Sequence, residues 1–198
     1  MGKRDDILDT AMALFNRYGY QAVGVDRIRD EAQVSKMTLY KYFATKEALV
    51  EAVLRLRHER FKQSLELWVS GHPDPVEGLR AVFNWHLRWF SSRQFQGCMF
   101  IKAVAEFYQA DEYLAVARLH KEWLRDLICA LLTDMGLKEA AAKASYLQVM
   151  LDGMIVNAGT FGSLSHVDAT WQGACDYVGI EYVALEAPDL VTLPDSVF

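Results

Sequence analysis

The chain lacks several features that mark common classes of protein. Its 198 residues include only 4 prolines, and its 3 cysteines, Cys98, Cys129 and Cys175, form no Cys-x-x-Cys pair. An odd number of widely spaced cysteines does not make a disulfide framework, so we expect reduced thiols. No uninterrupted apolar run is long enough to span a bilayer, and the first residues lack the apolar stretch of a signal peptide. These absences predict a soluble, cytoplasmic protein.

Familiar catalytic patterns are missing as well. There is no glycine-rich phosphate loop and no nucleophile with a neighbouring base, and the 5 histidines show no metal-ligand spacing. The sequence therefore predicts a protein that is not an enzyme and that holds no cofactor and no metal.

Acidic residues are absent from one segment of an otherwise acidic chain. Between Glu31 and Glu47 the only charges are Lys36, Lys41 and Lys46, although the formal net charge of the protein is -5. Residues 1–62 carry 12 Lys and Arg against 9 Asp and Glu, whereas the remainder carries 9 against 17. A segment with cations only, on the more basic part of the chain, indicates a polyanionic partner.

Apolar residues recur at helical spacing along almost the whole chain, and there is no hairpin signal. The pattern predicts an all-α protein of about nine helices. It divides into a three-helix helix-turn-helix domain (1–46), a C-terminal helical domain (47–186) and a tail (187–198). The expected helices are 5–18, 25–32, 36–42, one from 46 to the break at Ser70, 76–91, 98–110, 112–135, 138–161, and one capped by Asp168 that ends near Leu185.

The second and third of these helices are short and joined by a tight turn, which is the spacing of a helix-turn-helix. Ser35 is a good N-cap for the third helix, and Leu39 and Phe43 share its buried side. In such a motif the second helix lies in the major groove of duplex DNA, with its first turn nearest the base edges. Here that turn holds Lys36, Met37 and Thr38, which can donate to guanine or pack on a thymine methyl group.

Other side chains of this region suit the phosphate backbone. Tyr40 and Tyr42 carry phenol hydroxyls and Lys41 carries an ammonium group on the flanks of the third helix. Lys46 adds its charge to the positive N-terminal end of the fourth helix. The preceding helix brings Arg27, with Arg29 as a further candidate. The predicted DNA-binding residues are Arg27, Lys36, Met37, Thr38, Tyr40, Lys41, Tyr42 and Lys46.

Residues 5–50 resemble the DNA-binding domain of the tetracycline-repressor-like (TetR/AcrR) family of bacterial regulators. The matching positions are Gly19-Tyr20, Ile28, Ala32, Val34-Ser35, Thr38-Leu39-Tyr40, Tyr42-Phe43, Lys46-Glu47 and Leu49. The resemblance implies that Thr38, Tyr40, Tyr42 and Lys46 contact the phosphates and the groove. The chain departs from the family pattern at Gly24, Arg29, Gln33 and Met37, which affects the expected operator sequence. The segment 97–107 also resembles a C-terminal motif found in one branch of the family.

The resemblance further implies a ligand-responsive repressor whose C-terminal domain receives a small molecule. For a partly apolar effector, the aromatic, Met and polar side chains of that domain predict a pocket built from Trp85, His86, Trp89, Phe90, Met99, Phe107, Tyr108, Met150, Met154, Asn157 and Phe161. Asp152 is a further polar group that could orient the ligand.

The family also implies a homodimer formed through the last two helices. Small and apolar residues there suit close packing against a two-fold mate. The predicted dimerisation residues are Leu147, Leu151, Met154, Ala158, Trp171, Cys175, Val178 and Tyr182. The same side chains would serve equally well as the core of a single chain.

Two other functions stay open at the level of sequence. An all-α enzyme or small-molecule carrier would need the lysine and tyrosine segment to be incidental. A regulator that responds to oxidation through Cys98, rather than to a ligand, is the second alternative, although no cation is adjacent to that thiol.

Overall fold

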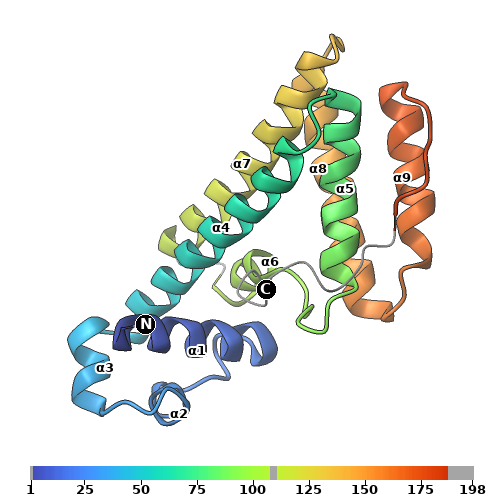
Figure 1. Ribbon diagram of the computed structural model, residues 1–198. Helices are drawn as coiled ribbons and strands as arrows, with labels where there is room; N and C mark the ends of the chain where they lie inside the picture. Colours follow the sequence, from blue (N-terminus) through green and yellow to red (C-terminus); the bar gives the residue numbers. More distant parts are fainter. Residues whose placement is uncertain (1, 108–110, 187–198) are drawn as a thin grey trace. The chain divides into compact units, whose positions relative to one another are not determined.

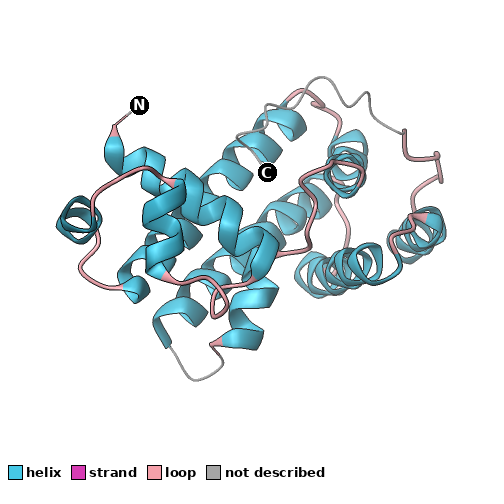
Figure 2. Cartoon of the chain, turned by 90° about the horizontal axis from the view of Figure 1, so that it is seen from below, coloured by secondary structure: helices cyan, strands magenta, loops and turns pink. Residues whose placement is uncertain are grey.

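The computed structural model describes residues 2–107 and 111–186. In these residues it shows nine helices and no strand, which confirms the all-α prediction (Figures 1 and 2). The helices are α1 (Lys3–Tyr18), α2 (Val25–Glu31), α3 (Lys36–Tyr42), α4 (Lys46–Ser70), α5 (Pro75–Phe90), α6 (Met99–Glu106), α7 (Asp111–Asp134), α8 (Ala140–Phe161) and α9 (Ser165–Val178). None of the helices in the described residues is long and apolar enough to cross a membrane.

The chain divides into two compact units. The first comprises Met1–Glu59 and Cys98–His120, and the second comprises Arg60–Gly97 and Lys121–Phe198. Helices α4 and α7 therefore contribute residues to both units. The division into functional domains at residue 46 stays a prediction. The expected tail, 187–198, and Tyr108 lie outside the described residues.

The first unit contains the helix-turn-helix. Helices α1, α2 and α3 pack on one another (Figure 1), with Phe15, Tyr20, Ile28 and Leu39 buried between them. Helices of seven residues such as α2 and α3 are not stable alone in water, so this shared core is what holds them. The turn between them requires a left-handed residue at Gln33, whose φ is 52°. Here the family pattern commonly has glycine, which adopts that conformation without steric cost.

The second unit is organised around aromatic side chains of α5. Asp74 caps this helix by accepting from the N–H groups of Val76 and Glu77, and Pro75 occupies its first position. On the buried face, Trp85 and Trp89 pack around the ring of Phe61 from α4 with centroid distances of 4.4 and 5.4 Å. Helix α8 packs against α5 and α9.

Two helices differ by three or more residues from the boundaries expected from the sequence. Helix α6 ends at Glu106 instead of continuing to residue 110. Helix α9 begins at Ser165, three residues before the predicted cap Asp168, and ends at Val178 rather than near Leu185. The reason for the early end is Gly179, which adopts a left-handed conformation with a φ of 80° and closes the helix.

Candidate nucleic-acid interface

The local sequence explains how α3 begins. Ser35 has an extended backbone, and its hydroxyl accepts from the N–H group of Thr38 at 3.0 Å. The two hydroxyls of these residues are themselves 2.8 Å apart, so the Thr38 side chain is engaged and half-buried. On the inner side of the helix, Leu39 and Phe43 are buried. The cap and this pair of apolar residues fix which face of α3 is turned outward.

The outward face carries the side chains expected for base and phosphate contacts. Met37, in the first turn of α3, has 83% of its surface exposed. Lys36 and Lys41 are exposed, and the rings of Tyr40 and Tyr42 are about two-fifths exposed, at 43% and 41%. The helix thus presents two cations, two phenols and a thioether without a carboxylate, which suits an anionic groove.

Lys46 lies in the first turn of α4. The hydroxyl of Thr45 caps this helix by accepting from the N–H group of Ala48 at 3.1 Å. The Lys46 ammonium is 3.5 Å from the carbonyl oxygen of Gln21, in the loop that precedes α2. This placement puts a cation at the start of a helix, an arrangement that favours phosphate.

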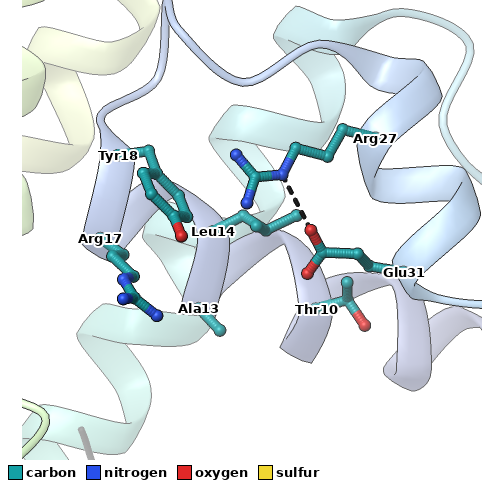
Figure 3. A pocket seen from close by; sticks show the side chains of 7 residues that line it. All are labelled: Thr10, Ala13, Leu14, Arg17, Tyr18, Arg27 and Glu31. Atoms are coloured by element: carbon teal, nitrogen blue, oxygen red, sulfur yellow. Dashed lines mark hydrogen bonds and ion pairs between the residues drawn. The ribbon is translucent and has the colours of Figure 1, made fainter.

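The guanidinium groups of α2 are already paired. Arg27 donates from Nε to Oε1 of Glu31 at 2.8 Å, and its guanidinium carbon lies 4.1 Å from the centre of the Tyr18 ring. These three side chains are among those that line a pocket of about 310 Å³ formed by residues of α1 and α2 (Figure 3). Arg29 pairs with Asp26 and Asp30 at 2.8 and 2.7 Å. A phosphate contact by either arginine would therefore require it to leave an acidic partner.

Comparisons with known proteins bear directly on this interface. The family model described as bacterial regulatory proteins, tetR family, matches residues 7–53, which include α1, α2 and α3. Residues 7–53 are a TetR-family domain. The chain is 35% identical over 81 residues to the transcriptional regulator RutR of Escherichia coli, a match that covers 41% of this chain and 33% of RutR. It thus spans about a third of that relative. It is 29% identical over 111 residues to the transcriptional repressor NemR of the same organism, covering 55% of this chain and 56% of NemR.

Solved structures extend the likeness to the rest of the TetR-family fold. A TetR-family regulator from Streptomyces coelicolor, SCO4454, superimposes with a TM-score of 0.83 at 29% identity, covering 89% of this chain and 93% of that one. The reduced form of Escherichia coli NemR superimposes with a TM-score of 0.80 at 20% identity, covering 88% and 96% of the two chains. The second likeness concerns the fold alone.

A contact that the sequence did not predict fastens the helix-turn-helix to α6 inside the first unit. The carboxylate of Glu106 accepts from the N–H group of Tyr20 at 3.1 Å and from that of Gln21 at 2.7 Å. The buried hydroxyl of Tyr20 donates to the carbonyl oxygen of Met99 at 2.9 Å, and burial is the main reason that the pKa of this phenol is raised. Lys102 donates to the carbonyl oxygen of Asn16 at 2.7 Å. Helix α6 therefore holds the loop between α1 and α2 at several points.

We expect Glu106→Gln to lower the free energy of unfolding by about 1–2 kcal/mol. An amide has one accepting oxygen, so one N–H group loses its partner and the other loses a charge-assisted bond. The change is measured by urea unfolding. Glu59→Gln, on an exposed side chain of the same unit, is the matched control. Equal stability of the two variants would contradict the role given to Glu106.

The predicted pocket residues are divided between the two units. Trp85, His86, Trp89 and Phe90 lie buried on α5, and Met154 is buried on α8, all within the second unit. Met99 and Phe107 belong to the first unit, where the Phe107 ring packs on Tyr20 and Tyr113 with centroid distances of 5.4 and 4.5 Å.

The remaining pocket candidates lie on α8. Met150 and Asn157 are half-buried, and the Asn157 amide donates to the carbonyl oxygen of Gly153 at 2.9 Å. Phe161 is 71% exposed. Asp152 accepts from Gln148 and pairs with Lys121 of α7.

The dimerisation residues expected from the sequence are part of the core of a single chain. Seven of the eight are buried, and Tyr182, half-buried, donates to a carboxylate oxygen of Asp168 at 2.6 Å. Their role in dimerisation stays a prediction, and within one chain these side chains already belong to the core. A different row of α8 residues is exposed, and its members are alternately four and three positions apart. They are Ala142, Tyr146, Val149, Gly153, Val156 and Thr160. We call this row the outer stripe of α8.

Proposed function

We propose that the protein is a transcriptional repressor that binds operator DNA as a homodimer and is released by a small molecule bound in its second unit. The observation that carries the proposal is the outward face of α3, where lysine, tyrosine and methionine side chains are exposed and no carboxylate is present. The name of its relative NemR, a transcriptional repressor, supports the repressing role.

In this proposal α3 lies in the major groove. Lys36 and Met37 reach the base edges, while Tyr40, Tyr42, Lys41 and Lys46 hold the phosphates on either side. Thr38 contributes through its methyl group, because its hydroxyl is engaged by Ser35. The excess of cations in residues 1–62 steers this part of the chain toward DNA, whereas the acidic remainder is repelled.

Pairing of two copies through the outer stripe of α8 is the second part of the proposal. About half or more of the surface of Tyr146, Val149 and Val156 is exposed, at 49%, 66% and 50%. The alternation of four and three residues is that of a helical seam that packs against another helix. A two-fold pair then presents two copies of α3 to successive major grooves, roughly 34–36 Å apart or somewhat wider.

The effector acts by differential affinity. A ligand releases the operator only if it binds more tightly to the arrangement of the two DNA-binding heads that fits DNA poorly.

The test is an electrophoretic shift with the DNA upstream of the protein's own gene. We expect Lys46→Ala to weaken binding about tenfold and to reduce the dependence of log K on log salt by about one, because one phosphate contact is lost. Lys138→Ala removes an equal charge from an exposed position between α7 and α8, and should leave the affinity unchanged. Absence of a shift, or equal affinities of the two variants, would reject the proposal.

A further inference from the structure

A pocket of about 510 Å³ lies within the second unit, where α5 and α8 end. We call it the α5–α8 pocket. Its volume is within the range of sites that hold drug-sized molecules. Its lining contains no Asp, Glu, Lys, Arg or His. The lining residues are Phe90, Ser91, Ser92, Phe95, Gln96, Ala158, Gly159, Gly162 and Leu164.

The two sides of the pocket differ in size. From α5 and the loop after it come two phenyl rings, Phe90 and Phe95, with centroids 5.3 Å apart; Trp89 packs behind Phe95 at 5.2 Å. From α8 come Ala158 and two glycines. A Cβ atom built on Gly159 would meet nothing within 4 Å. Gly159 and Gly162 have no side chain, so there is open space beside the rings. This shape suits a flat apolar molecule.

One polar atom of the pocket has no partner. The hydroxyl oxygen of Ser92 is buried without a hydrogen bond. A buried hydroxyl in this condition costs about 1–3 kcal/mol, and it can either donate or accept when a partner arrives. Since the lining has no charged side chain, it offers no counter-charge for the part of an ionic ligand that it buries. The chemistry therefore selects against both anions and cations.

We propose that the α5–α8 pocket binds a neutral aromatic molecule of about two fused rings that carries one hydrogen-bonding group for Ser92. The proposal rests on the proposed function, because it names the chemical class of the effector. Among the lining residues, Phe90 also belongs to the effector pocket predicted from the sequence. The rings of Phe90 and Phe95 provide the stacking surface, and the helix-terminal glycines of α8 provide the room.

The experiment compares three probes of one shape on the full chain in the absence of DNA. We expect 2-naphthol to bind at least tenfold more tightly than 2-naphthoate, whose charge the lining cannot neutralise. Naphthalene, without a hydroxyl, should bind about 3–10 times more weakly than 2-naphthol. Dissociation constants are measured by calorimetry or by ligand-observed NMR.

Two variants connect the binding to this pocket. Gly159→Leu fills the space beside the rings and should weaken 2-naphthol binding at least tenfold. Leucine favours the helix by about 1 kcal/mol over glycine, so lost binding would not reflect unfolding. Gly159→Ala, which adds one methyl group, is the matched control and should change the affinity less than threefold. Ser92→Ala should abolish the preference for 2-naphthol over naphthalene.

The outcomes separate this inference from the proposed function. If no probe binds, or if Gly159→Leu binds 2-naphthol like the wild type, the inference is overturned whatever the protein does with DNA. If Gly159→Leu changes the oligomeric state and the wild type binds no probe, a second copy occupies the pocket and the inference also falls. Binding that Gly159→Leu abolishes, in a protein that shifts no DNA, would uphold the pocket and reject the repressor.

Discussion

A single aspartate at Val149 is expected to turn the protein into a monomer and to weaken operator binding more than a hundredfold. Val149 lies in the middle of the outer stripe of α8 and is 66% exposed in one chain, so the substitution leaves the fold intact. In a two-fold pair, each copy would bring one carboxylate to the same seam. Burial of an unpaired ion costs several kcal/mol, and the symmetry imposes that cost twice.

Sedimentation equilibrium and operator titration measure the two effects. Leu67→Asp is the matched control, because Leu67 is 77% exposed on α4 and lies outside the stripe. This variant should pair and bind DNA as the wild type does. A Val149→Asp protein that remains a dimer would show that the outer stripe is not the pairing surface.

Acid is expected to destabilise the protein through His86. This side chain is fully buried on α5, and its Nδ1 atom lies 2.8 Å from the carbonyl oxygen of Val82. A carbonyl only accepts, so Nδ1 carries the proton and the ring is neutral. Its other nitrogen, Nε2, is buried without a partner. Burial lowers the pKa of His86 from the ordinary value of 6.5 to about 4, despite the bond to Val82.

The sign of the effect follows from proton binding. Between pH 6.5 and about pH 4, the unfolded chain binds a proton at residue 86 and the folded chain does not. The stability present above pH 6.5 is therefore lost as the pH falls through this window. With 1.36 kcal/mol per pKa unit, the loss reaches about 3 kcal/mol near pH 4.

Urea unfolding at several pH values tests this expectation. His86→Phe keeps an apolar ring of similar size and should show a pH dependence that is smaller by about 3 kcal/mol over the same interval. His86→Leu serves if the phenylalanine variant does not fold. His72→Gln, at a half-buried position on the chain between α4 and α5, should keep the wild-type dependence. Parallel curves for the wild type and both His86 variants would contradict the assignment.

Much of the helix-turn-helix could be predicted because its signals are local. The Ser35 cap, the buried pair Leu39 and Phe43, and the cap at Thr45 all act within one turn of the residues that they fix. The start of α5 was off by one residue, and the start of α8 by two, because N-terminal turns tolerate several caps. The predicted ninth helix is too long because Gly179 ends α9.

Contacts between distant segments left no such signal. The bonds of Glu106 to Tyr20 and Gln21 join residues 86 and 85 positions apart, and no spacing in the sequence indicates them. Helix α8 posed a different problem because it has two apolar stripes. The one with larger side chains, including Leu147 and Leu151, was assigned to the dimer, yet large residues are also what a core requires. The outer stripe, which includes Tyr146, Val149 and Val156, is exposed in one chain.

The Glu106 carboxylate also constrains how the chain can vary over generations. Gly19 has a φ of 82°, and a Cβ atom added there would lie 2.7 Å from Oε1 of Glu106. A side chain at 19 is therefore opposed twice, by the left-handed backbone and by the carboxylate beside it. Descendants that keep this turn should keep glycine at 19 even where residue 106 has changed.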